Sequence, residues 1–157
     1  MCSDSESRYV GLEIVRRDSR GIAREEQTHV ADVYRLEDLV AWQLANEIKD
    51  AVFALLRTTP AGRDFRFAGQ VGEAASSVAS NIAEGFYRYN PAEFANFLRY
   101  ARASVAELLT RLPDGVKRGY YAQADIESLL ATLSREAAVI GGLRDSMRRL
   151  AKERKKT

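Results

Sequence analysis

The 157-residue sequence is poor in the side chains that carry most metal, redox and nucleophilic chemistry. It contains one cysteine, Cys2, and one histidine, His29, and both precede the periodic part of the chain. A single cysteine allows neither an internal disulfide nor a paired-cysteine zinc site. One histidine cannot supply the Glu-x-x-His pairs of a di-iron bundle, and the serines lack a histidine base. We therefore expect no enzyme activity and no cofactor.

Long apolar runs and a leader-like N-terminus are also missing. The longest uncharged run in the helical part, Ala74 to Ala83, is far short of the roughly 18 residues that span a membrane. Asp4, Glu6 and Arg8 precede any apolar segment, which does not fit a signal peptide. The sequence therefore predicts a cytoplasmic protein without a membrane partner.

The composition that remains is that of an ordinary folded protein, with 46% hydrophobic and 29% charged residues. The length suits one domain, which we place at 34–150, between an irregular N-terminal extension at 1–33 and a basic tail at 151–157. Within the extension only Tyr9–Val15 alternates like a strand. This segment is either a mobile extension or an ordered arm added to a neighbouring molecule.

Positive charge is concentrated at the C-terminus, although the net charge is only +2. Six of the ten residues from 148 to 157 are Lys or Arg, against one acidic residue. The end of the chain is either a phosphate-binding arm or a solvated helix end whose cations suit the helix dipole. The cations are Arg148, Arg149, Lys152, Arg154, Lys155 and Lys156.

Apolar residues recur at three- and four-residue steps from Leu36 onward, the spacing of amphipathic helices. Asp64 and Asn90 are suitable N-caps for the second and third helices because their short side chains accept hydrogen bonds from free backbone N–H groups. Four such helices with short connections are most simply satisfied by an all-α, antiparallel up-and-down four-helix bundle. The helices are predicted over 36–57, from Asp64, from Asn90, and over 126–150.

Two positions are expected to interrupt these helices. Gly85 suits a left-handed C-cap at the end of the second helix. Pro113–Gly115 falls within the apolar stripe of the third helix, where proline removes a backbone donor. The third helix therefore either ends near Arg111 or kinks and resumes through Val116, and we favour the kink.

The run Ser76–Gly85 combines small and polar residues within the second helix. Small side chains let a neighbouring helix approach closely, so the run is interpreted as a packing segment. Asn81 and Glu84 share one helix face, where Asn81 can bond to backbone and Glu84 can pair with an arginine. The alternative is a polar patch that recognises a partner. The candidate arginines are Arg88, Arg99 and Arg102.

Aromatic side chains offer a second candidate surface. Bases of single-stranded RNA stack on exposed aromatic rings, and the segment 86–90 is the best candidate because Arg88 lies within it. Aromatics at helical spacing are more often part of a core or a subunit interface, which remains the alternative. The side chains in question are Trp42, Tyr87, Tyr89, Tyr100, Tyr120 and Tyr121.

Three segments together resemble a known family. Leu36–Ala45 resembles its opening helix, Gln70 with Ser76–Gly85 resembles its Ser-Asn-Ile-Ala-Glu-Gly signature, and Ser104–Thr110 followed by Gly119-Tyr120 resembles its third helix. The chain from about Tyr34 to Leu150 is thus similar to the four-helix-bundle proteins related to those encoded in 23S rRNA intervening sequences. Ala103, where the family often has glycine, and Pro113–Gly115, which replaces a helical run, depart from the pattern.

The resemblance implies a ring-like homo-oligomer of five bundles and no established catalytic activity. It also implies a distant kinship with retroelement accessory proteins that bind a reverse transcriptase and nucleic acid. We therefore expect an RNA-associated or ribonucleoprotein accessory factor, with a protein-interaction scaffold as the alternative. The arginines above and the cations of the tail are the candidate contacts for RNA or a partner. The motif residues with a mainly structural role are Ser80, Asn81, Ile82, Glu84, Gly85 and Glu107.

Overall fold

A computed structural model describes residues 35–156. The predicted extension at 1–33, with its strand-like segment, Cys2 and His29, lies outside the described residues. The described part contains four long α-helices joined by short connections, two of which contain a 3-10 turn. The helices are α1 (Val40–Thr58), α2 (Phe65–Tyr87), α3 (Pro91–Lys117) and α4 (Glu127–Glu153), with 3-10 turns at Leu36–Asp38, Pro60–Arg63 and Gln123–Asp125.

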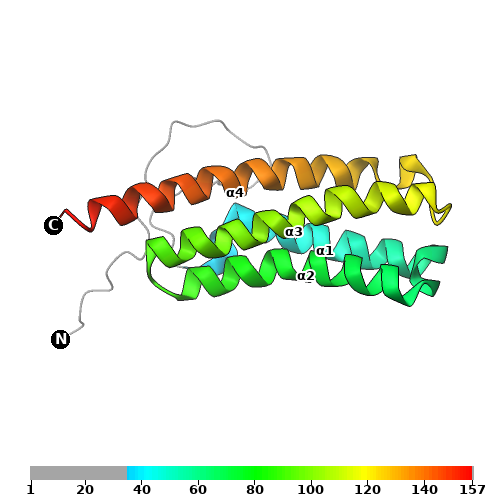
Figure 1. Ribbon diagram of the computed structural model, residues 1–157, viewed down its shortest axis with the longest axis horizontal. Coiled ribbons are helices and arrows are strands. Elements are labelled where there is room, and N and C mark those ends of the chain that lie inside the picture. Colours follow the sequence, from blue (N-terminus) through cyan, green and yellow to red (C-terminus); the bar gives the residue numbers. More distant parts are fainter. Residues whose placement is uncertain (1–34, 157) are drawn as a thin grey trace, which may run out of the picture.

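Successive helices run in opposite directions along one long axis (Figure 1). Each helix packs on the next in the chain, and α1 also packs on α4, which closes the bundle. No strand is present between residues 35 and 156. The prediction of an all-α protein with four helices packed in sequence order is confirmed.

The helix starts follow the expected caps, with one shift. The Asp64 carboxylate accepts a hydrogen bond from the Phe67 backbone N–H at 3.0 Å, and the Asn90 side chain accepts from Ala92 N at 2.9 Å. The first helix begins at Val40 rather than Leu36, because Leu36–Asp38 form a separate 3-10 turn and Leu39 is extended. Leu36 and Leu39 are nonetheless buried in the core.

The prediction that Gly85 is a left-handed C-cap is wrong. The helix α2 continues to Tyr87, and Gly85 is a buried helical residue facing α3. A Cβ at Gly85 would lie 2.6 Å from Phe94 Cδ2 and 2.7 Å from Phe97 Cβ. Glycine is therefore required there by close packing, and the left-handed backbone falls instead at Tyr89, with φ of 54°.

Helix α3 runs without interruption through Pro113 to Lys117, so the alternative that it ends near Arg111 is wrong. The expected resumption beyond Pro113 is confirmed, and the bend at this position stays a prediction. Next to the proline in sequence, the Leu112 carbonyl accepts a hydrogen bond from the buried Tyr121 hydroxyl at 2.9 Å. This bond ties the connection after α3 to the helix. At the other end of the chain, α4 continues to Glu153, three residues into the predicted tail.

The core is a continuous apolar column along the bundle axis, made by one stripe from each helix. It contains the apolar positions expected from spacing, including Phe86 of α2, Leu98 of α3 and Leu133 of α4, each fully buried. Burial of large apolar side chains stabilises a fold by roughly 1.5–3 kcal/mol each. The same packing fixes which residues of each helix are left on the surface.

Candidate nucleic-acid interface

Several predicted contact residues meet at one end of the bundle, which we call the turn end. It consists of the turn at residues 88–90, the first half of α3 and the last turns of α4, which project beyond that turn (Figure 1). Residues that are far apart in sequence are therefore brought to the same end. Met147 and Leu150 of α4 pack against the core. The exposed cations beside them, Arg148 and Arg149, therefore lie on an ordered helix.

Arg88 is the first residue of the turn and the C-cap of α2. Its guanidinium donates to Glu84 Oε1 at 2.6 Å, and its other terminal nitrogen lies 3.9 Å from Glu93 Oε2. The hydrogen bond to Glu84 raises the pKa of Arg88, followed by the charge of the same carboxylate. Among the three arginines considered for Glu84, the structure thus places Arg88 in contact. The side chains of Arg88, Glu84 and Glu93 are each about half exposed. Ion pairs at such exposed positions add little to stability, so these two pairs mainly orient the arginine.

Two aromatic rings in contact with each other, each with an arginine beside it, lie on the outer surface of α3 next to the turn. The Arg88 guanidinium lies 5.3 Å from the Phe97 ring centre, and the Arg99 guanidinium lies 4.6 Å from that of Tyr100. Phe97 and Tyr100 are themselves in edge contact at 6.1 Å. We call Arg88, Phe97, Tyr100 and Arg99 the arginine–aromatic ladder. A guanidinium stacked in this way can still bind an anion at its edge, but the edge of Arg88 already meets Glu84 and Glu93, so Arg99 is the ladder cation suited to an added anion.

Two further tyrosines flank the ladder at the turn. Tyr87 is 53% and Tyr89 48% exposed, and Tyr100 is also 48% exposed. The rings of Tyr87 and Tyr89 are nearly perpendicular, at 6.5 Å between centres. Tyr89 is the only non-glycine residue with positive φ in the described part of the chain, a conformation that bulky side chains rarely adopt. No sequence signal marked this residue as strained.

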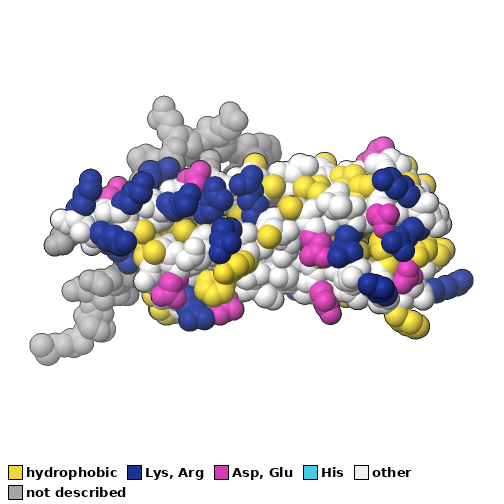
Figure 2. All heavy atoms as spheres, in the orientation of Figure 1, with side chains coloured by type: hydrophobic (Ala, Val, Ile, Leu, Met, Phe, Trp, Pro, Cys, Tyr) yellow, Lys and Arg dark blue, Asp and Glu magenta, His cyan; other side chains and the backbone are white. Residues whose placement is uncertain are grey.

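The remaining predicted cations are exposed on neighbouring surfaces of α3 and α4. Figure 2 shows Lys and Arg side chains gathered over the C-terminal half of α4 and the adjoining part of α3. Arg149 donates to the Ser146 hydroxyl, a neutral partner, at 2.9 Å. The exposed cations of this surface are Arg99, Arg102, Arg148, Arg149, Lys152, Arg154, Lys155 and Lys156.

The polar residues of Ser76–Gly85 form a helix contact. Asn81 donates from its side-chain amide to the Ser77 carbonyl at 2.8 Å and to the Ser77 hydroxyl at 2.9 Å. The Ser104 hydroxyl of α3 donates to the same Ser77 hydroxyl oxygen at 3.1 Å. These hydrogen bonds link α2 to α3 and so fix the packing of the two helices. They include no side chain that could act as a general base. Ile82 is fully buried beside it, whereas Ser80 is exposed.

A second polar link joins α2 and α3 further along. The Glu107 carboxylate accepts from Arg111 Nε at 2.7 Å, and Arg111 Nη1 donates to Gln70 Oε1 at 2.8 Å. Glu107 therefore orients an arginine that contacts the other helix. It lies about 24 Å from the start of α3, well away from the turn end. The structure does not bring Glu107 together with the candidate contacts.

The other aromatic candidates do not reach the turn end. The Tyr120 hydroxyl donates to Asp64 Oδ2 at 2.6 Å, and this bond raises the pKa of Tyr120. Tyr121 is buried, which raises its pKa to about 12. Trp42 is partly buried against the core. Of the six aromatic candidates, only Tyr87, Tyr89 and Tyr100 therefore lie at the surface near the basic residues.

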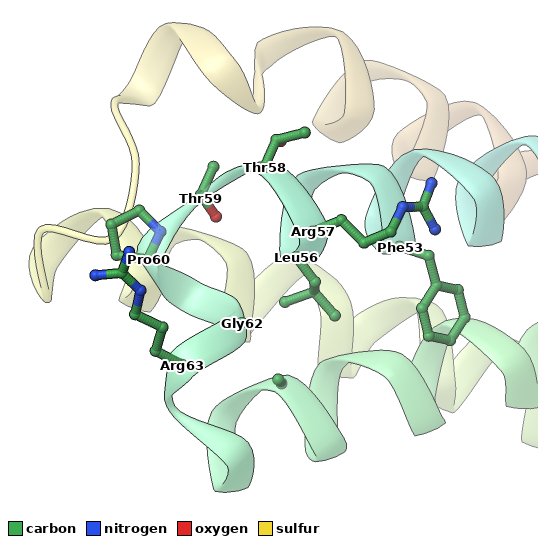
Figure 3. A pocket seen from close by; sticks show the side chains of 9 residues that line it. Phe53, Leu56, Arg57, Thr58, Thr59, Pro60, Gly62 and Arg63 are labelled. Carbon is green, nitrogen blue, oxygen red and sulfur yellow. The ribbon is translucent and has the colours of Figure 1, made fainter.

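An open hollow lies at the end of the bundle opposite the turn end, between α1, the 3-10 turn at Pro60–Arg63 and α2 (Figure 3). Phe53, Leu56 and Ala68 give it apolar walls. Arg57 and Arg63 stand at its rim but point in opposite directions (Figure 3). Its lining contains no carboxylate, histidine or cysteine, so the hydroxyls of Thr58 and Thr59 have no base in the lining to activate them.

Glu136 is the polar residue that sequence reasoning missed. It is fully buried in α4, and neither carboxylate oxygen has a hydrogen-bond partner. Burial raises its pKa to about 8, and the charge of Arg135 only partly opposes this. A signal was present in the sequence, because Glu136 follows Leu133 by three residues and precedes Ile140 by four. It therefore occupies an apolar position of the helix stripe.

Residues 35–156 hold neither a metal cluster nor a membrane span. No group of three or more His, Cys, Asp or Glu side chains is placed to hold a metal ion in this part of the chain. None of its helices combines the length and apolar character needed to cross a membrane.

Comparison with known proteins gives a family match over the bundle. The model of the 23S rRNA-intervening sequence protein family matches residues 37–142, which spans all of α1, α2 and α3 and the first half of α4. The part of the turn end from Arg88 to Arg102 lies inside the match. The basic residues from Arg148 onward lie outside it. No curated protein matches the sequence.

Proposed function

Because the chain belongs to the 23S rRNA-intervening sequence protein family, we propose that it is a non-enzymatic accessory protein that binds RNA at the turn end. The observation that carries the proposal is the meeting of two groups of exposed cations there. One group, Arg88, Arg99 and Arg102, comes from α2 and α3, and the other from the last turns of α4. Spacing along the sequence does not place them together, whereas the bundle does.

The chemistry of these side chains fits a phosphate backbone. Binding of Lys and Arg to phosphates releases counterions, so each neutralised phosphate adds to affinity and to salt dependence. Arg99 is stacked on Tyr100, which holds its guanidinium in place for a phosphate oxygen. The cations of α4 lie on a helix rather than on a loose segment up to Glu153, which reduces the entropy lost on binding.

We further propose that the protein acts as a homo-oligomer, a ring of five copies, as the family resemblance implies. Large apolar side chains on the surface support assembly, since Phe65 is 88% and Phe53 37% exposed. Both lie toward the end opposite the turn end. Light scattering at micromolar protein concentration should give five times the mass of the chain. A monomer under these conditions would contradict this part of the proposal.

RNA binding is tested with nuclease-treated protein and labelled RNA over a range of salt concentrations. We expect the logarithm of the association constant to fall linearly with the logarithm of salt concentration. Removal of residues 148–157 should make this slope shallower, by about 0.7 for each phosphate of a single strand that the tail no longer neutralises. Binding that ignores salt would contradict the proposal. A slope that survives the deletion unchanged would confine the interface to α2 and α3.

The second candidate function is a protein-interaction scaffold without a nucleic-acid role, with a reverse transcriptase as one candidate partner. The exposure of Phe65 favours it, because a ring so far out of the core is typical of protein interfaces. Affinity purification before and after nuclease digestion separates the two functions. A protein partner retained after digestion, together with absent RNA binding, would favour the scaffold.

A further inference from the structure

We infer that the tyrosines of the turn end form a stacking platform for unpaired bases, so that the RNA recognised there is single-stranded. This inference rests on the proposed function and specifies its ligand. Basic side chains alone would accept any polyanion, including a duplex. Tyr87, Tyr89 and Tyr100 add a requirement for accessible base faces.

The three tyrosine rings are exposed in a way that leaves room for bases. Each side chain is close to half exposed, so part of it is packed on the protein and part is accessible to solvent. Tyr87 rests in edge contact with the fully buried Phe86, at 5.4 Å between ring centres. Tyr87 and Tyr89 meet at 80°, so their faces do not stack on one another. The exposed part of the Tyr87 ring can be covered by a planar ligand.

The arginines next to the rings provide the second component of a single-strand site. Arg99 lies 4.6 Å from the centre of Tyr100, and Arg88 lies 5.3 Å from that of Phe97. Unpaired bases stack on guanidinium planes as well as on aromatic rings, and the same guanidinium can bond to the adjacent phosphate. The arginine–aromatic ladder thus combines side chains suited to the two kinds of surface that a single strand presents, base and phosphate.

The backbone of Tyr89 is a third and independent observation. Its φ of 54° is unfavourable for a bulky residue and would suit glycine. The turn is fixed on both sides, since Arg88 N bonds to the Gly85 carbonyl and Asn90 caps α3. A strained residue kept at the tip of a turn is typical of functional positions. Here the strain holds an aromatic ring at the surface.

A duplex does not fit this arrangement equally well. In an A-form helix the base faces are stacked on each other, so only phosphates and ribose groups would meet the turn end. The rings would then contribute little to affinity. A protein partner would use the same rings but would need neither unpaired bases nor phosphates. Single-stranded RNA is the ligand that uses both the tyrosines and the arginines.

The wild-type protein provides the first test. Fluorescence anisotropy is measured with a labelled 12-nucleotide oligouridylate, the same ribose-phosphate strand without bases, and a 12-base-pair RNA duplex. We expect oligouridylate to bind about 5- to 150-fold more tightly than the strand without bases for each stacked base. Equal, salt-dependent affinity for all three would overturn the stacking platform and leave the proposed function intact. Absence of binding to all three would overturn both.

A variant at Tyr89 gives the second test. Tyr89→Gly removes the ring and relieves the backbone, so the urea midpoint of unfolding should stay the same or rise. Affinity for oligouridylate should fall at least about 5-fold, whereas affinity for the strand without bases should not change. Tyr89→Phe should retain the affinity because it keeps the ring.

Two controls complete the test. Tyr120→Phe alters a tyrosine at the opposite end and should leave oligouridylate binding unchanged. Light scattering should give the same mass for Tyr89→Gly and the wild type. A changed mass would assign the tyrosines to a contact between copies and overturn the inference, as would unchanged oligouridylate affinity in Tyr89→Gly.

Discussion

Helix α3 packs against α2 on one side and α4 on the other, and the two contacts differ in kind. The contact with α2 is close and directional, with Gly85 against Phe94 and a hydrogen bond between Ser77 and Ser104. Helix α4 instead buries Glu136, a carboxyl group without a hydrogen-bond partner. Apolar contacts are non-directional and tolerate small shifts, whereas hydrogen bonds and close glycine contacts do not. The pair α2–α3 therefore defines the register of the bundle, and α4 is the less firmly specified helix.

The largest expected effect concerns Glu136. Its pKa is near 4.5 in the unfolded chain and about 8 in the folded one, so the folded state holds the proton more firmly. Stability is then complete below pH 4.5, falls as pH rises toward 8, and levels off above it. A shift of this size corresponds to about 3–5 kcal/mol. Urea unfolding at pH 4.5, 6 and 9 should show the fall in wild type.

An apolar or uncharged residue in place of Glu136 should remove the weak point in the packing of α4 and so raise the free energy of unfolding. Glu136→Leu should raise the free energy of unfolding at pH 9 by about 3–5 kcal/mol, because the buried charge is removed and apolar area is added. Glu136→Gln should abolish the pH dependence. Glu127→Gln, at an exposed position of the same helix, serves as the control and should have little effect. A wild-type protein equally stable at pH 6 and 9 would contradict the assignment.

The second expected effect would break the α2–α3 contact. In Gly85→Ala the new methyl group would collide with Phe94 and with Phe97 Cβ, which cannot rotate away. Overpacking of this kind costs about 1–3 kcal/mol, despite the better helix propensity of alanine. Gly69→Ala is the matched control in α2, since nothing lies within 4 Å of its added Cβ. Chemical denaturation should show opposite signs for the two variants, and equal signs would refute the packing argument.

A smaller effect is expected from Ser104→Ala. The substitution removes the hydrogen bond to Ser77 between the two helices and should lower the free energy of unfolding by about 1 kcal/mol. Ser134→Ala in α4 is a suitable control because the Ser134 hydroxyl bonds within its own helix, to the Leu130 carbonyl. If both variants lose the same stability, the link between α2 and α3 adds nothing specific.

The smallest effect should strengthen α4 itself. Gly142 lies within α4, is exposed, and has open space where a Cβ would be. Gly142→Ala should stabilise the protein by about 0.5–1 kcal/mol through backbone entropy and helix propensity. Thermal unfolding measures the gain. A loss of stability would mean that the surface at Gly142 is covered in the assembled protein, which light scattering at low concentration can check.

Sequence periodicity predicted the helices and most of the core, because the apolar stripes are long and the caps at Asp64 and Asn90 use ordinary side-chain chemistry. It failed at Gly85, where tertiary packing rather than backbone freedom requires glycine. It also left two outcomes open at Pro113, where α3 in fact continues. Neighbouring helices supply contacts at these positions, and a sequence pattern within one helix does not contain them.

The candidate site was predictable in its residue types but not in its grouping. Arg88, Arg99 and the cations after Met147 were recognisable as exposed, whereas their meeting at one end depends on the up-and-down order of the helices. Spacing along the sequence also did not show which tyrosines are held in the bundle and which lie at its surface. Tyr120 donates a hydrogen bond to Asp64, whereas Tyr89 lies at the surface in a turn where its own φ is positive.

The order in which the helices pack has a consequence for how the chain folds. Three of the four helix pairs join neighbours in sequence, and only the contact between α1 and α4 closes a long loop. Chains dominated by such local contacts have low contact order and fold in microseconds to milliseconds. Docking of α4 onto α1 carries the largest loop-closure entropy, so we expect it late, after the α2–α3 hairpin. A nascent chain could thus assemble its first three helices while α4 is still being synthesised.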